Sequence, residues 1–131
     1  MRKIGILNSE IVKEISAIGH TQFLIIGDAG LPIPKGIKVV DLALKSGIPS
    51  FLETLEAVLD EMVVENYYLA DEIKSKNFAL NDKVKKIAEN LPHAYISHEE
   101  LKKMSEQAQV IIRTGETSPY ANIVLVAGVN F

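Results

Sequence analysis

Two short polar segments hold most of the residue types that could do chemistry in this chain. The first comprises residues 19–21 and 27–32, which include a histidine and an aspartate among glycines and a proline. The second comprises residues 113–116 and 119–122, which include an arginine, a glutamate, a tyrosine and an asparagine. Both are predicted to form turns between apolar runs, where rigid scaffolds usually carry function. We therefore expect a site at these turns.

Histidine is the natural candidate for proton transfer, because its unperturbed pKa of about 6.5 lets the ring give and take a proton near neutral pH. His20 stands between glycine and threonine at a predicted helix-to-strand junction, where the ring could reach a crevice. The alternative is a structural polar residue. His98 is predicted in the first turn of a helix, either at the site or facing solvent, and His93 is expected on the surface.

Asp28 directly follows an apolar run, so its carboxylate could orient a histidine or accept hydrogen bonds from ligand hydroxyls, or it could simply cap its own turn. For Arg113 and Glu116 we expect an ion pair that fixes the loop. Tyr120 and Asn122 flank a single residue, so both side chains could point the same way, and both are uncharged donors and acceptors. These groups suit a sugar better than a phosphate.

Other site chemistries fit the sequence less well. A metal could use His20, Asp28 and a second histidine, but none has the tight spacing of metal motifs. The chain has no glycine-rich helix start followed by lysine, no dinucleotide fingerprint and no serine nucleophile elbow. It contains no cysteine, which excludes disulfides, thiolate zinc sites and a cysteine nucleophile.

The composition limits the kinds of partner that the chain is expected to bind. The 131 residues fit a single domain, residues 1–131, with 14 basic against 17 acidic side chains and no basic stripe, so nucleic acid is not expected as a partner. We identify no signal peptide and no apolar run near the roughly 20 residues that cross a bilayer, so we expect a soluble, cytoplasmic protein without membrane contact. The 47% hydrophobic content favours a homo-oligomer.

Helical and strand-like patterns alternate along the chain. Helices are predicted at 9–18, at 51–62, from 81 or 82 to 90, and at 98–106, and strands at 23–26, 39–44, 67–70, 94–96, 110–112 and 123–129. Capping signals mark three of the helix starts: Asn8 or Ser9, Ser50 with Glu53, and Ser97 with Glu100. This alternation predicts a three-layer α/β/α fold with a largely parallel central sheet of about six strands and helices on both faces. Ligands of such sheets bind beyond the carboxyl ends of the strands, so both polar segments are expected to share one crevice.

Distinctive motifs occur along the whole chain, at residues 8–9, 19–21, 28–34, 47–51, 61–62, 72–74, 97–99, 113–116, 118–123 and 127–129. In combination, these motifs resemble the ribose pyranase and fucose mutarotase family from end to end, and its ribose branch more closely. Two departures are visible. Gln22 stands where an acidic residue is expected, and residues 76–94 match weakly.

The resemblance implies an isomerase that interconverts the pyranose and furanose ring forms of D-ribose for ribose use after uptake, without a cofactor. It implies a ring-shaped homo-oligomer, a decamer, with sites near subunit contacts. His20 matches the catalytic position, as the general acid that assists ring opening; the sugar-binding positions are Asp28, His98, Tyr120, Ala121 and Asn122. Alternatives are a fucose-type mutarotase and a non-catalytic ribose-binding accessory of a sugar transporter.

Overall fold

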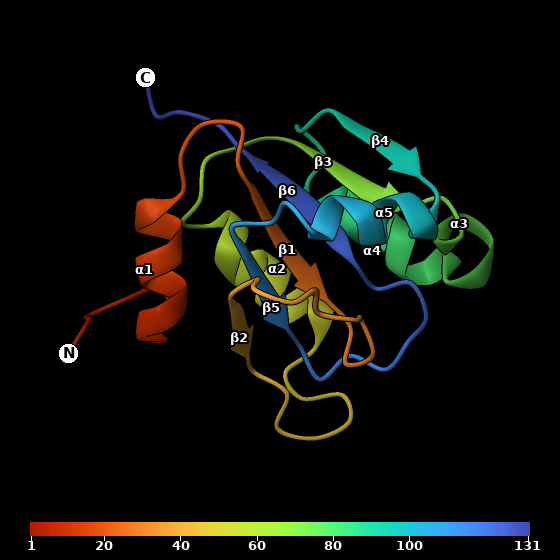
Figure 1. The fold of residues 1–131 in the computed structure, drawn as a ribbon, viewed down its shortest axis with the longest axis horizontal. Helices are drawn as coiled ribbons and strands as arrows, with labels where there is room; N and C mark the ends of the chain where they lie inside the picture. Colours follow the sequence, from red (N-terminus) through yellow and green to blue (C-terminus); the bar gives the residue numbers. More distant parts are fainter.

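The computed structural model describes residues 1–131, in which one six-stranded sheet lies between helical layers (Figure 1). The elements in chain order are α1 (Ser9–Ala17), β1 (Phe23–Gly27), β2 (Val39–Asp41), α2 (Phe51–Leu59), β3 (Val64–Ala70), α3 (Ile73–Lys76), α4 (Phe78–Ile87), β4 (His93–Ile96), α5 (His98–Ser105), β5 (Val110–Arg113) and β6 (Ile123–Ala127). The strand order is β2-β5-β1-β6-β3-β4, and only β6 runs antiparallel to its neighbours. The predicted largely parallel α/β sheet is confirmed.

Side-chain alternation along β1 divides the core into two layers. Leu24 and Ile26 face the layer that contains Phe51 of α2, whereas Ile25 faces the layer that contains Leu101 of α5. All five side chains are fully buried, and burial of such a side chain contributes about 1.5–3 kcal/mol. Figure 1 shows α2 and α4 behind the sheet and α5 in front of it. Helices therefore cover both faces, as predicted.

Three helix starts follow the capping signals in the sequence. The Asn8 side chain accepts a hydrogen bond from a backbone N–H in the first turn of α1. Ser50 and Glu53 form a reciprocal capping box at α2, and the Ser97 side chain caps α5. These caps fix where each helix begins, and the last one places His98 at the first position of its helix.

Some boundaries differ from the sequence prediction because side-chain contacts, both local and distant, set them. β2 ends at Asp41 rather than at residue 44, since the Asp41 carboxylate accepts a hydrogen bond from the Ala43 N–H and turns the chain. α3 was not predicted, and α4 begins at residue 78 rather than at 81 or 82. The amide of Asn77, between those helices, donates instead to Ser118 and Pro119 of the second polar segment.

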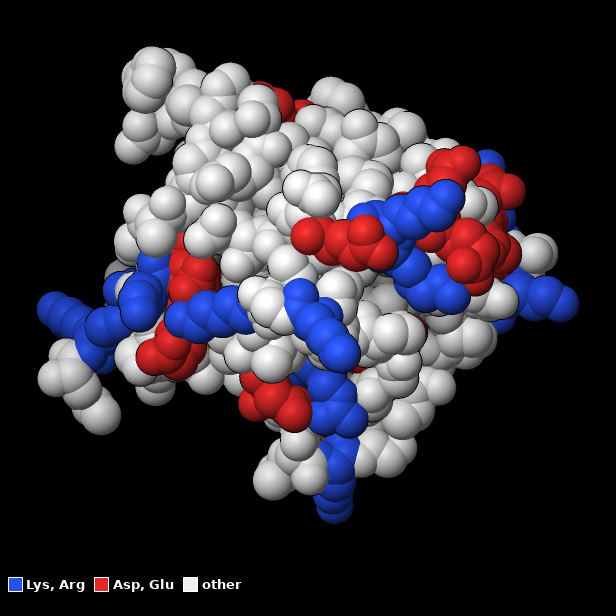
Figure 2. All heavy atoms as spheres, viewed as in Figure 1, with Lys and Arg blue, Asp and Glu red and all other residues white.

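Charged side chains of both signs intermingle on the face in Figure 2, and an uncharged area extends toward the upper left, where the chain ends. The exposed apolar side chains of the termini include Ile4, Leu7, Val129 and Phe131. No helix in the structure is both long enough and apolar enough to traverse a lipid bilayer.

Candidate functional site

The two polar segments meet at the carboxyl end of β1 through a reciprocal pair of hydrogen bonds. The Asp28 N–H donates to Asn122 Oδ1 at 2.9 Å, and Asn122 Nδ2 donates to Asp28 Oδ2 at 2.9 Å. The strand register brings them together, because Ile26 of β1 pairs with Ile123 of antiparallel β6. Asn122 has no exposed surface, whereas Asp28 is partly exposed. Asn122 therefore holds the Asp28 carboxylate at the rim of the sheet.

Gly27 permits this close approach. A Cβ at Gly27 would lie 3.1 Å from Asn122 Oδ1 and 2.6 Å from a side-chain carbon of Leu31. The Gly27 carbonyl in turn accepts a hydrogen bond from the buried Thr114 hydroxyl at 2.8 Å. A glycine at this position is thus a packing requirement of the site.

Tyr120 adopts a strained backbone conformation next to this pair. Its φ of 57° lies in the left-handed region that non-glycine residues rarely occupy, and its carbonyl accepts a hydrogen bond from the Asn122 N–H. Such conformations concentrate at functional sites. The Tyr120 ring meets the His98 ring edge to face, with centroids 5.2 Å apart, whereas Ala121 between Tyr120 and Asn122 is fully buried.

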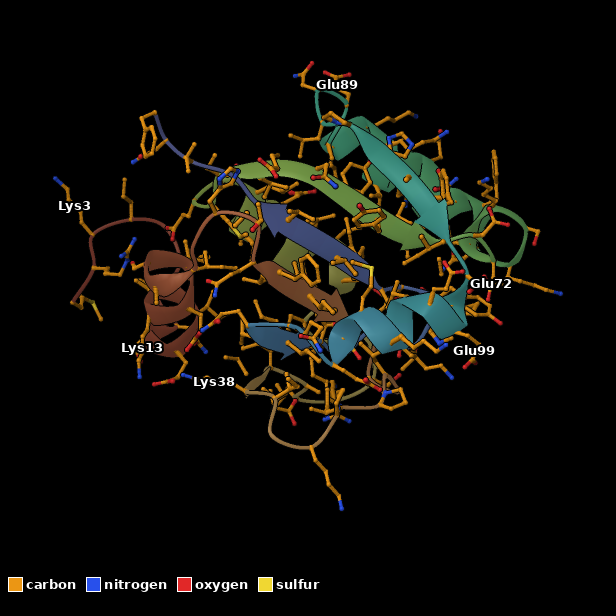
Figure 3. The ribbon with its side chains drawn as sticks, turned by 45° about the horizontal axis from the view of Figure 1, so that its top comes forward. Lys3, Lys13, Lys38, Glu72, Glu89 and Glu99 are labelled. Carbon is orange, nitrogen blue, oxygen red and sulfur yellow. The ribbon has the colours of Figure 1, made fainter.

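His98 is half-buried rather than facing solvent. Its backbone N–H donates to both carboxylate oxygens of Glu72 at 3.1 Å, and Figure 3 shows Glu72 beside the start of α5. Its Nδ1 is buried and has no hydrogen-bond partner in the chain, a condition that a bound polar ligand would relieve. Sequence reasoning did not single out Glu72, because its partner is 26 residues away.

The predicted ion pair between Arg113 and Glu116 is wrong. Arg113 Nη1 instead donates to the Asp41 carboxylate at 2.8 Å, and its Nε donates to the Ala29 carbonyl at 3.0 Å. The strand pairing explains the contact between Arg113 and Asp41, because the two residues are direct neighbours in the parallel register of β2 and β5. Arg113 therefore anchors the turn that follows Asp28.

Glu116 binds the start of α2. Its carboxylate accepts hydrogen bonds from the Phe51 N–H at 3.0 Å and from the Ser118 hydroxyl at 2.9 Å. A helix start offers unpaired N–H groups and a partial positive charge, which favour a carboxylate. Burial acts to raise the pKa of Glu116, but the hydrogen bonds from Phe51, Ser118 and Thr117 outweigh it and hold the pKa below its ordinary value. This carboxylate fixes the loop before Tyr120.

A hollow of about 290 Å³ lies beside Asp28, between the two polar segments. Residues 28–30 line one side, and residues 116–119 line the other. The hollow offers a carboxylate, a hydroxyl and backbone groups to a small polar ligand. No three His, Asp or Glu side chains cluster anywhere in the chain in a way that could hold a metal ion.

His20 lies at the opposite end of the sheet. It precedes β1, whereas Asp28 follows β1, and the strand alone spans about 13 Å at about 3.3 Å per residue. The Thr21 N–H donates to the carbonyl of Ala127, the last residue of β6. The expectation of one shared crevice thus holds for Asp28 and Asn122 but is wrong for His20 within one chain.

The surroundings of His20 form a second hollow. Its side chain is 51% exposed, and its Nε2 lies 2.9 Å from Oε2 of Glu65. The hollow, of about 510 Å³, is lined mainly by residues 18–20, 61–63 and 127–131. His20 is therefore accessible to a ligand or to another protein chain.

Comparison with known proteins gives a consistent assignment. Residues 1–130 match the RbsD / FucU transport protein family. The chain is 47% identical to a D-ribose pyranase of Geobacillus thermodenitrificans over 100% of this chain and 99% of the relative. It is 49% identical to a D-ribose pyranase of Exiguobacterium sibiricum over the full length of both.

Solved structures agree with these sequence matches. Bacillus subtilis RbsD in complex with D-ribose superimposes with a TM-score of 0.97 at 44% identity, over 100% of both chains. The fucose mutarotase of Streptococcus pneumoniae in complex with L-fucose gives a TM-score of 0.84 at 22% identity, again over 100% of both chains, which shows a shared fold. The chain belongs to the RbsD / FucU transport protein family.

Proposed function

We propose that this chain interconverts the pyranose and furanose ring forms of D-ribose, in the cytoplasm after uptake of the sugar. The observation that carries the proposal is the full-length similarity to proteins named D-ribose pyranase, together with a TM-score of 0.97 to a relative solved with D-ribose. The reaction transfers no electrons and no group to another molecule, so it requires no cofactor.

The site is completed between two copies of the chain in a homo-oligomer. The Asp28 end of one copy supplies the sugar-binding groups, and the His20 end of another supplies the imidazole. This arrangement is supported by the separation of the two ends within one chain and by the apolar surface near His20, where Val63, Val129 and Phe131 are exposed. Burial of such surface drives subunit association. A ring-shaped decamer with sites at subunit contacts accommodates this pairing.

Ring opening is a proton-transfer reaction. The bond between the ring oxygen and the anomeric carbon breaks as the ring oxygen gains a proton, and the anomeric hydroxyl loses its proton to water to give the open aldehyde. After rotation, a different hydroxyl loses its proton as it attacks the aldehyde carbon, the aldehyde oxygen regains a proton from water, and the other ring closes. His20 is the general acid that protonates the ring oxygen, and its imidazole then takes a proton back during closure.

The Asp28 end holds the sugar in place for this reaction. The Asp28 carboxylate accepts hydrogen bonds from sugar hydroxyls in an orientation that Asn122 fixes. The phenol of Tyr120 and the unpartnered Nδ1 of His98 bind further hydroxyls. Ala121 supports these groups from the buried side. A fixed sugar orientation lowers the barrier to each proton transfer.

The test is magnetisation exchange between the pyranose and furanose NMR signals of ribose, with and without protein. The wild-type chain is expected to accelerate exchange, and His20→Ala to lose about 100-fold or more of the acceleration. His93→Ala is the matched control, because His93 is exposed and lies outside both hollows.

Three results would contradict the proposed reaction, the proposed substrate or the proposed role of His20. Ribose binding without faster exchange would indicate a non-catalytic accessory of a transporter. Faster conversion of L-fucose than of D-ribose would indicate a fucose-type mutarotase. Full activity of His20→Ala would remove His20 from the mechanism.

A further inference from the structure

A β-bulge lies next to His20. In the pairing of β3 with β6, Val64 is opposite Ala127 and Asn66 is opposite Val126, so Glu65 is an extra residue without a partner of its own. A bulge bends its strand and turns the extra side chain away from the regular pleat, and bulges are frequent next to active sites. The extra side chain here is a carboxylate that reaches His20.

Gly128 allows the bulge to lie against the C-terminal segment. A Cβ on Gly128 would lie 3.2 Å from a methyl carbon of Val63 and 3.4 Å from the Cβ of Glu65. The Gly128 N–H also donates to the Val63 carbonyl at 2.9 Å. The position of Glu65 is therefore set by close backbone packing as well as by its contact with the imidazole.

The backbone that carries His20 is fixed against the same strand. The Thr21 N–H donates to the Ala127 carbonyl at 2.9 Å, and Gln22 Oε1 accepts a hydrogen bond from the Gly19 N–H at 2.6 Å. β6 lies between β1 and β3 in the sheet, so the end of β6 has His20 on one side and Glu65 on the other. Two rigid neighbours thus present the imidazole and the carboxylate to each other.

We propose that Glu65 is a positioning residue for His20, whose carboxylate keeps a proton on Nε2 of the imidazole and leaves Nδ1 to exchange a proton with the sugar. A carboxylate only accepts hydrogen bonds, so the 2.9 Å contact requires the proton on Nε2. When Nδ1 also carries the proton that the general acid gives to the ring oxygen, the ring is positive and the adjacent negative charge stabilises it. The inference rests on the proposed catalytic role of His20.

A purely structural ion pair would behave differently. Both side chains are about half exposed, at 51% for His20 and 41% for Glu65. Exposed pairs contribute little to stability. Removal of the Glu65 carboxylate is therefore expected to leave folding nearly unchanged and to act on the reaction.

The experiment combines ¹⁵N NMR of the histidine rings with the ribose exchange assay on the full-length protein. In the wild-type homo-oligomer, where the neighbouring copy covers His20, Nε2 of His20 is expected to carry a proton that exchanges slowly with water. Glu65→Ala should lose this slow exchange and lower kcat by about 10- to 100-fold with little change in KM, because proton transfer rather than binding is impaired. Glu65→Gln, whose amide oxygen still accepts from Nε2, should keep the slow exchange and recover part of kcat.

Glu56→Gln is the matched control, since Glu56 is exposed on α2 and forms no side-chain hydrogen bond or ion pair. The inference is overturned if Glu65→Ala stays within about twofold of wild-type kcat, or if it loses activity while the Nε2 proton of His20 is unchanged. In either case an inactive His20→Ala variant would leave the proposed function standing. An active His20→Ala variant would instead refute the role of His20 itself, and the inference with it.

Discussion

Asn122→Ala removes the side chain that holds the Asp28 carboxylate. The variant loses two hydrogen bonds of 2.9 Å, one from the Asp28 N–H and one to the Asp28 carboxylate. A neutral hydrogen bond contributes about 1 kcal/mol and one to a charged group about 1.5–3 kcal/mol. Water can reach the partly exposed carboxylate and restore part of the second bond. We expect the free energy of unfolding to fall by about 2–3 kcal/mol.

The assay is urea denaturation at a fixed chain concentration, because association also stabilises the folded chain. Asn81→Ala is the matched control. Asn81 is also buried but accepts a single neutral hydrogen bond, from the Tyr95 hydroxyl at 2.8 Å, and it lines neither hollow. The control is expected to lose about 1 kcal/mol and to keep ribose exchange, whereas Asn122→Ala is expected to lose both stability and activity. Equal losses in the two variants, or full activity of Asn122→Ala, would refute this reasoning.

Two further variants test side-chain contacts that stabilise the fold. The pKa of Glu116 in the folded chain lies below its ordinary value of 4.5. The ionised carboxylate therefore stabilises the fold at pH values above 4.5, and this contribution is lost as the pH falls through the folded-state pKa. Urea denaturation at neutral and at acidic pH should therefore show that the free energy of unfolding falls less on acidification for Glu116→Gln than for wild type. An equal fall in both proteins would contradict the role of this carboxylate. Ser50→Ala removes the side-chain cap of α2 and should cost about 1 kcal/mol in the same assay with ribose exchange unchanged; no loss of stability would show that the capping box is unimportant.

Local signals predicted much of the fold. Ser50 with Glu53, and Ser97 ahead of Glu100, mark helix starts through hydrogen bonds within four residues, and the structure forms them. Such contacts depend on nearby sequence alone. The start of α4 depends on Asn77, whose side-chain partners Ser118 and Pro119 lie 41 and 42 residues away, so propensity could not place it.

Part of the site could likewise be predicted from the sequence. Asp28 and Asn122 meet because both lie at one edge of the sheet, a rule that needs only strand order and direction. The side chains of Arg113 and Glu116 instead form hydrogen bonds with residues 72 and 65 positions away, which no local pattern reveals. The position of His20 also follows from the chain order, because a residue before a strand and a residue after it must lie at opposite ends of that strand.

The central claim is that His20 of one copy acts on a sugar held at the Asp28 end of another. Co-expression of His20→Ala with Asp28→Asn, each carrying a different tag, gives mixed oligomers for the ribose exchange assay. Random mixing pairs an intact His20 with an intact Asp28 at about one quarter of the sites, so about a quarter of wild-type activity should return although each variant alone is inactive. Mixed oligomers that are no more active than their parents would contradict the claim.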